Sequence, residues 1–151
     1  MHSNEDLPAL AVELIAAGSH FTRAAYQASG MELSNVSMRA LAALEREPGL
    51  RIGELAAREG IRQPSMSQAM KRLVNDGYAA RHTADDDARA TALTITDAGR
   101  KVLRSYRAAA AEAVAPVFDA LKPEDVATLK RAAELLPELT AELKQRTGGR
   151  A

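Results

Sequence analysis

The sequence contains no cysteine and no tryptophan, and aromatic residues make up only 3% of its 151 residues. Without cysteine there is no disulfide scaffold, no thiolate zinc site, no thiol catalysis and no cysteine-based sensing of oxidants. A chain poor in aromatic rings and rich in alanine and leucine favours close-packed helices over a β-sandwich or barrel. The composition therefore predicts one mainly helical body with a core of small and aliphatic side chains.

The chain also lacks a net charge and a long apolar run. Its 20 basic residues balance 20 acidic ones, so a nucleic-acid partner can be inferred only from local clusters of charge. The N-terminal segment 1–6 is polar and acidic, unlike a secretory signal, and no stretch approaches the ~20 apolar residues of a membrane-spanning helix. With 46% hydrophobic residues the chain can form a packed core, and we expect a soluble cytoplasmic protein with no membrane partner.

Helical periodicity and turn residues predict four helices before residue 77. Ser34 is a good N-cap for the second helix, and Pro64 suits the first turn of the fourth. Gly60 and Gly77 are suitable stops for the third and fourth helices. The predicted ranges are 7–28, 35–46, 52–59 and 63–76.

The pattern changes after residue 77. Segments 78–83 and 91–95 have the period-two character of strands, and the charged segment 85–89 between them is predicted to be a hairpin turn. A long helix capped by Thr96 and Asp97 then runs to about Leu121. A last helix begins at Pro123, and Pro137 inside it is expected to kink or split it.

This order of elements predicts a mainly α fold with a small β-hairpin wing. A short helix, a tight turn with a glycine and a second helix form a helix-turn-helix, and the hairpin after it is the wing. We assign residues 34–96 to a winged helix-turn-helix domain, and residues 1–33 and 97–147 to a helical dimerisation region. The apolar stripes of these end segments need covering, most simply by each other and by a second copy of the chain.

Five short motifs, in order and with matching spacing, make the chain resemble the MarR family of bacterial transcription regulators. They are Leu50–Ala56, Gln63–Ser67, Leu73–Tyr78, Asp87–Arg89 and Leu93–Arg100. The resemblance implies a homodimer that binds double-stranded DNA at a pseudo-palindromic operator and works at the nucleoid. It further implies a repressor that a small molecule releases from DNA. The chain departs from the family at Arg51 and Arg62, where a serine or threonine helix cap is common.

The fourth helix is predicted to be the recognition helix. Ser65, Ser67 and Gln68 lie away from its apolar stripe and can face the major groove, where glutamine matches adenine and serine can donate or accept. Lys71 and Arg72 suit phosphate contacts. An ordinary solvated helix face is the alternative for each of these residues. The complete predicted DNA-binding set is Arg62, Gln63, Pro64, Ser65, Ser67, Gln68, Lys71, Arg72, Arg81, Asp87 and Arg89.

Arg89 is predicted to act from the tip of the hairpin. A long cation there can enter the minor groove and favour narrow, A·T-rich stretches. The resemblance implies that Asp87 orients this guanidinium or braces the wing. A solvated turn is the alternative.

A second group of residues occupies the positions at which the family forms its effector pocket. It consists of His20, Arg23, Tyr26, Met31 and Arg39. A cation and a hydroxyl in an apolar crevice would suit a small aromatic or acidic ligand. The alternative is a purely structural role at a helix junction.

No pattern in the sequence predicts a metal site, a cofactor or catalysis. The acidic run 85–87 lacks the spacing of a calcium loop, and the three histidines lie far apart. There is no nucleophile elbow and no glycine-rich phosphate loop. We expect a regulator that is not an enzyme. A winged-helix module for protein interaction and a DNA-binding regulator without a ligand are the alternative functions.

Overall fold

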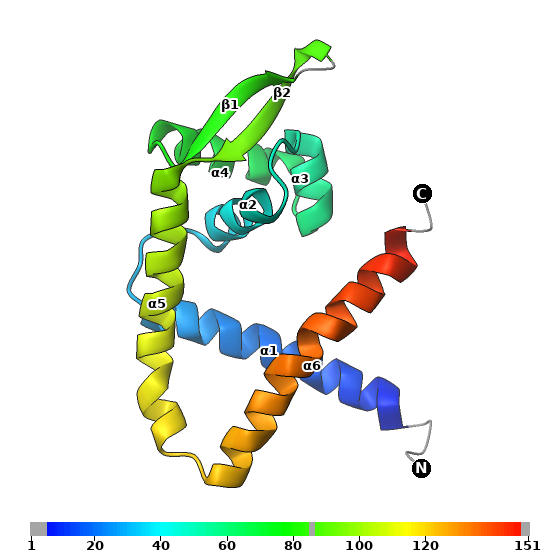
Figure 1. The fold of residues 1–151 in the computed structure, drawn as a ribbon, viewed down its shortest axis with the longest axis vertical. Coiled ribbons are helices and arrows are strands. Elements are labelled where there is room, and N and C mark those ends of the chain that lie inside the picture. The colour runs from blue at the N-terminus through cyan, green and yellow to red at the C-terminus, as the bar shows by residue number, and fades with distance from the viewer. Residues whose placement is uncertain (1–5, 85–86, 149–151) are drawn as a thin grey trace. The chain divides into compact units, whose positions relative to one another are not determined.

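The computed structural model describes residues 6–84 and 87–148. Within these residues the chain forms six helices and one antiparallel hairpin of two strands (Figure 1). In chain order the elements are α1 (Asp6–Ala28), α2 (Asn35–Arg46), α3 (Ile52–Glu59), α4 (Gln63–Asn75), β1 (Ala79–Ala84), β2 (Asp87–Ile95), α5 (Asp97–Asp119) and α6 (Pro123–Gly148). They belong to two compact units, residues 1–113 and 114–151.

The predicted fold class is confirmed, and the predicted helix ranges agree with the structure to within two residues. The prediction for the hairpin turn was wrong, because β2 already begins at Asp87. Asp87 and Arg89 therefore belong to a strand, and Asp85 and Asp86 lie outside the described residues. Thr83 pairs with Thr91 but Ala84 pairs with Asp87, so the register shifts near the end of the hairpin.

Pro137 does not split the last helix, which is continuous as α6. A proline inside a helix removes one backbone hydrogen bond and leaves the carbonyl of residue 133 without its partner. Both Ala133 and Pro137 lie on exposed turns, where water can bind that carbonyl. The cost of the proline is therefore small enough for the helix to continue.

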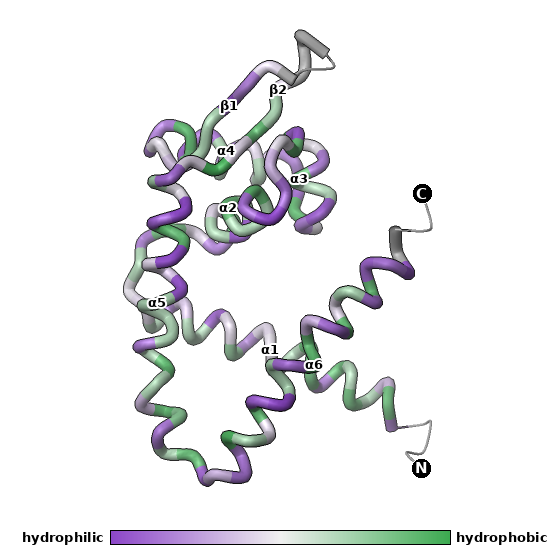
Figure 2. Tube along the Cα trace, viewed as in Figure 1, coloured by the Kyte–Doolittle hydropathy of each residue, from purple (hydrophilic) through white to green (hydrophobic). Residues whose placement is uncertain are grey.

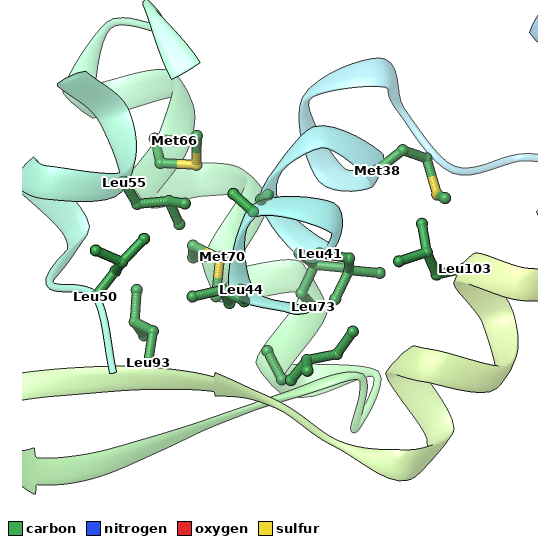
Figure 3. Packing of buried hydrophobic residues seen from close by; sticks show 14 of the residues in the cluster. Met38, Leu41, Leu44, Leu50, Leu55, Met66, Met70, Leu73, Leu93 and Leu103 are labelled. Carbon is green, nitrogen blue, oxygen red and sulfur yellow. The ribbon is translucent and has the colours of Figure 1, made fainter. Parts of the chain in front are cut away.

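The hydrophobic core lies in the first unit, between α2, α3, α4, the hairpin and the start of α5 (Figure 3). Aliphatic and methionine side chains dominate it, as the shortage of aromatic residues requires. Each fully buried side chain of this size contributes about 1.5–3 kcal/mol relative to exposure. The largest of them are Leu41, Leu44, Leu55, Met66, Met70, Leu73, Leu93 and Leu103.

The two helices of the helix-turn-helix begin without side-chain caps from Arg51 and Arg62. At α3 another residue compensates in part, because the Glu54 carboxylate accepts a hydrogen bond from the Arg51 backbone N–H at 2.7 Å. Helix α3 ends at Gly60, whose φ of 60° lies in the left-handed region. Three residues, 60–62, then separate α3 from α4.

The loop between α2 and α3 is attached to the hairpin. Leu50 forms an isolated β-bridge with Leu93, whose N–H donates to the Leu50 carbonyl at 3.0 Å. The Gly49 N–H in turn donates to the Leu93 carbonyl at 2.8 Å. The middle of β2 is thus held on one side by β1 and on the other by this loop.

Thr96 joins the end of α4, the base of the hairpin and the start of α5. Its hydroxyl donates to the Gly77 carbonyl at 2.6 Å and accepts from the Gly99 N–H at 3.0 Å. Its own N–H donates to the Tyr78 carbonyl at 3.1 Å. The backbones approach so closely here that a Cβ on Gly99 would lie 2.0 Å from the Tyr78 oxygen.

The second unit contains the end of α5 and all of α6. Glu124 and Asp125 lie in the first turn of α6, where acids interact favourably with the helix dipole. Leu129, Leu136 and Leu139 are exposed along this helix. None of the described helices combines the length and the apolar character that crossing a bilayer requires.

We predict that Gly99→Ala lowers the free energy of unfolding by about 2 kcal/mol or more, because the added methyl group overlaps a backbone carbonyl that cannot rotate away. Chemical denaturation of the purified variant measures this change. Gly53→Ala is the matched control in the first turn of α3, where the added Cβ would be 3.9 Å from its nearest neighbour. Equal stabilities for the two variants would contradict the close approach of the Gly99 and Tyr78 backbones.

Candidate functional site

Helix α4 has one buried face and one exposed face. Met66, Ala69, Met70 and Leu73 are buried against the rest of the first unit. Their spacing of three and four residues places them on a single stripe of the helix. Because this stripe fixes the rotation of α4, the side chains on the opposite face are held toward solvent.

The exposed face of α4 contains the residues predicted to bind DNA. Ser65, Gln68, Lys71 and Arg72 are exposed, and Ser67 is half-buried at the edge of the packed stripe. Residues 65, 68 and 72 follow each other at helical spacing and therefore share one side. The structure brings these side chains together on a single accessible strip.

Three further predicted residues lie at the start of this helix. Arg62 occupies the N-cap position with extended backbone angles, but its side chain does not cap the helix. Gln63 and Pro64 form the first turn, and all three residues are exposed. The proline costs nothing at this point, since the first N–H groups of a helix have no partner within it.

The hairpin supplies the remaining predicted DNA-binding residues. Arg81 is exposed in β1 and pairs across the hairpin with the buried Leu93. Next to Arg81, the His82 ring nitrogen Nε2 lies 2.9 Å from the Thr94 hydroxyl. Asp87 and Arg89 are in β2, and their side chains lie outside the described part of the structure.

The basic residues of α4 and β1 have no acidic partner within the described chain, whereas several arginines elsewhere in it do. Among the described residues, Arg62, Lys71, Arg72 and Arg81 form no ion pair. Arginines that do form one with aspartate or glutamate are Arg39, Arg46, Arg58, Arg100, Arg107, Arg131 and Arg146. Helix α4 itself contains no acidic residue. Its positive charge is therefore available to an external anion.

The structure places the five residues predicted to bind an effector on α1, in the loop after it and on α2. Tyr26 and Met31 pack against the core, whereas His20 and Arg23 are exposed on α1. The Arg39 guanidinium instead contacts Glu59 of α3, with 3.1 Å between Nε and Oε2. No metal-binding cluster of histidine and acidic side chains occurs within residues 6–84 and 87–148.

Sequence reasoning did not identify two residues that the structure places in contact with this group. Tyr106 of α5 stacks on Tyr26, with 4.6 Å between ring centroids and 27° between ring planes. Burial, and to a smaller extent the neighbouring Tyr26, raise the pKa of Tyr106. Glu59 is the partner of Arg39. No local signal in the sequence pairs residue 106 with a residue 80 positions earlier.

A short helix, a tight turn, an outward-facing second helix and a hairpin define the winged helix-turn-helix class (Figure 1). A sequence model of the MarR family matches residues 29–90. An HTH-type transcriptional regulator of Mycobacterium leprae is 30% identical over 114 residues, which cover 76% of this chain and 78% of that protein. The chain therefore belongs to the MarR family of transcriptional regulators, which are not enzymes.

Solved structures have the same fold. A MarR mutant of Escherichia coli superposes with a TM-score of 0.72 at 16% identity, over 84% of this chain and 95% of that one. A MepR mutant of Staphylococcus aureus bound to an oligodeoxyribonucleotide has a TM-score of 0.60 at 18% identity, over 87% of this chain and 96% of that one.

The raised pKa of Tyr106 makes stability depend on alkaline pH. The folded state keeps the phenol proton above pH ~10, where the unfolded chain loses it, so this contribution is complete below pH ~10 and falls as the pH rises further. We predict that the free energy of unfolding decreases more steeply above pH ~10 in the wild type than in Tyr106→Phe. Denaturant titrations at stepwise pH measure both slopes, and identical slopes would show that Tyr106 does not contribute.

Proposed function

We propose that this protein is a sequence-specific DNA-binding regulator that acts as a homodimer on a pseudo-palindromic operator. The observation that carries the proposal is the exposed strip of α4, which has hydrogen-bonding side chains, unpaired cations and no acid. A helix with this surface fits the major groove of duplex DNA, which is wide enough to admit it. A protein that acts on genomic DNA works in the cytoplasm, at the nucleoid.

The residues of α4 divide into two roles. Ser65 and Gln68 are proposed to contact base edges, because an amide can bind adenine through two hydrogen bonds. Arg62, Lys71 and Arg72 are proposed to contact phosphates, which supply affinity without sequence information. Gln63, Pro64 and Ser67 complete the predicted surface, with Pro64 shaping the first turn rather than reading bases.

The hairpin is proposed to reach the neighbouring minor groove. Arg81 is exposed on β1, and Arg89 lies in β2 near the connection between the strands. Cations from these positions would favour the negative potential of a narrow groove. Asp87 is proposed to orient Arg89, as the family resemblance implies.

Dimerisation is proposed because each unit exposes leucine and isoleucine side chains at helical spacing. Along α1 these are Leu7, Leu10, Leu14 and Ile15, and along α6 they are Leu129, Leu136 and Leu139. Figure 2 shows that hydrophobic and hydrophilic positions alternate along both helices. Monomeric proteins seldom leave such stripes in water. A second copy that covers them would place two α4 helices on one duplex, about 34–36 Å apart.

We further propose that the protein is a repressor that a small aromatic or acidic molecule releases from DNA. The support is the arrangement around the Tyr26–Tyr106 stack, where Arg23 lies one turn from Tyr26 and Met31 adds an apolar surface. An aromatic anion could stack on the partly exposed ring of Tyr26 and pair with the Arg23 cation. A ligand that favours a different spacing of the two α4 helices would weaken binding by its differential affinity for the two states.

Salt titrations of DNA binding test the proposed function. We predict that Arg89→Ala weakens binding to the selected operator and lowers the slope of log Kd against log salt by about one per protomer, because one cation that displaces counterions from the groove is lost. Fluorescence anisotropy with an operator obtained by in vitro selection measures the slope. An unchanged slope would remove Arg89 from the interface.

Gln68→Ala is the contrasting variant in the same experiment. It should keep the salt slope but reduce the preference for operator over random duplex by about 1–3 kcal/mol, because a base contact is lost. Equal losses on both duplexes would contradict base reading. A wild-type protein that binds no duplex at low salt, yet co-purifies with another protein, would favour the protein-interaction module instead.

Sedimentation velocity tests the proposed dimer. We predict that Leu139→Glu converts the dimer to a monomer and weakens operator binding, because a carboxylate within the apolar stripe of α6 must be desolvated on association. Ala141→Glu is the matched control, since position 141 is exposed on a different side of α6. A wild-type monomer, or equal effects of the two variants, would contradict the role of this stripe.

A further inference from the structure

The Glu59 carboxylate at the end of α3 is held by two arginines of α2. Its Oε2 atom lies 3.1 Å from Arg39 Nε, and its Oε1 atom lies 3.2 Å from Arg46 Nη2. Arg39 also donates through Nη2 to the backbone carbonyl of Glu59, in the last turn of α3. One arginine thus binds both the side chain and the backbone of this residue.

The burial of this cluster is uneven. The Glu59 side chain is 13% exposed, whereas those of Arg39 and Arg46 are 46% and 61% exposed. A second ion pair, Arg58–Glu47, also involves α3 and the end of α2, but both its partners are about half exposed. Glu59 is therefore the acid whose geometry the surrounding protein defines most tightly, because water competes least for it.

Helix α3 is held near its start by Ile52, which packs against the core, and by the Leu50–Leu93 bridge just before it, whereas the Glu59 contacts hold its other end. It is eight residues long, and only Leu55 and Ala56 are buried. Glu59 is its last residue, and three residues later α4 begins. A displacement of the Glu59 end of α3 on α2 would therefore move the first turn of α4, where Gln63 and Ser65 lie.

We infer that Glu59 is a positioning residue for DNA recognition, which holds the start of α4 at the orientation that base reading requires. The inference rests on the proposed function. Glu59 itself need not touch DNA, since its carboxylate is already engaged by Arg39 and Arg46. It also assigns Arg39 to this clamp in place of the predicted effector site.

The direction of the change in DNA affinity distinguishes a positioning role of Glu59 from a purely electrostatic one. Removing an acid from a DNA-binding protein strengthens its attraction to a polyanion, so a purely electrostatic role predicts tighter binding to every duplex. A positioning role predicts weaker binding to the operator and no loss on random DNA, because backbone contacts tolerate a small displacement of the first turn of α4 and base contacts do not.

The experiment compares Glu59→Gln with Glu47→Gln in the full-length dimer. Both variants remove one negative charge at the α2–α3 contact, but only the first disturbs the buried carboxylate. Affinity is measured by anisotropy for the duplex selected with the wild type and for a scrambled duplex of the same length. All titrations are run well below the lowest melting midpoint, so that each variant is fully folded.

We expect Glu59→Gln to bind the selected duplex about tenfold more weakly, comparable to one misread base pair, with unchanged or tighter binding to the scrambled duplex. Glu47→Gln should lose no affinity for the selected duplex or for the scrambled duplex. Arg39→Lys keeps the net charge but cannot hold the carboxylate and the carbonyl together, and it should also weaken binding to the selected duplex only.

Two results would overturn the inference while leaving the proposed function intact. One is a gain by Glu59→Gln on both duplexes, equal to that of Glu47→Gln. The other is an equal loss on both duplexes. A wild type that does not prefer any selected duplex would overturn the proposed function, and the inference with it.

Discussion

The burial of four side chains on one stripe of α4 is the constraint on which the rest of the site depends. Met66, Ala69, Met70 and Leu73 occupy the packed side of this helix. Because a helix is rigid over this length, burying one stripe determines where every other side chain points. Packing of this stripe into the core also leaves the polar side of α4 exposed to solvent. A change that rotated α4 would bury polar groups and expose apolar ones together.

The distribution of ion pairs gives a neutral chain a local positive surface. Several arginines on α2, α3 and α5 are paired with acids close to them, as in the Arg107–Glu45 pair at 3.0 Å. Helix α4 has no acid of its own. Total charge therefore carries no information about this surface, and the partner of each cation has to be known. Such segregation leaves one face of a neutral chain with a local excess of positive charge.

Local signals in the sequence were sufficient to predict most of the fold. The Ser34 hydroxyl accepts from the Ser37 N–H at 3.1 Å as an N-cap, and Gly60 and Pro64 mark the boundaries that were expected of them. Helical spacing also placed Ser65 and Gln68 on the exposed side of α4. These features depend on residues within one turn of each other, so the sequence contains them directly.

Contacts between distant residues could not be predicted in this way. Arg39 and Glu59 are 20 positions apart, and no periodicity indicates that they meet. The start of β2 was also misjudged, because the charged residues 85–89 indicate a turn more strongly than alanines indicate a strand. Pro137 was expected to interrupt a helix that in fact continues, since the cost of one missing hydrogen bond depends on exposure, which the sequence alone does not give.

The bridge between Leu50 and Leu93 has a mechanical consequence for the hairpin. The backbone N–H and C=O of Leu93 both bond to the loop before α3, and Leu93 is opposite Arg81 of β1 on the other edge of β2. Any bending of the hairpin at this pair would have to break the bridge to the loop before α3. This part of the wing is therefore tied to the α2–α3 connection as well as to its own partner strand.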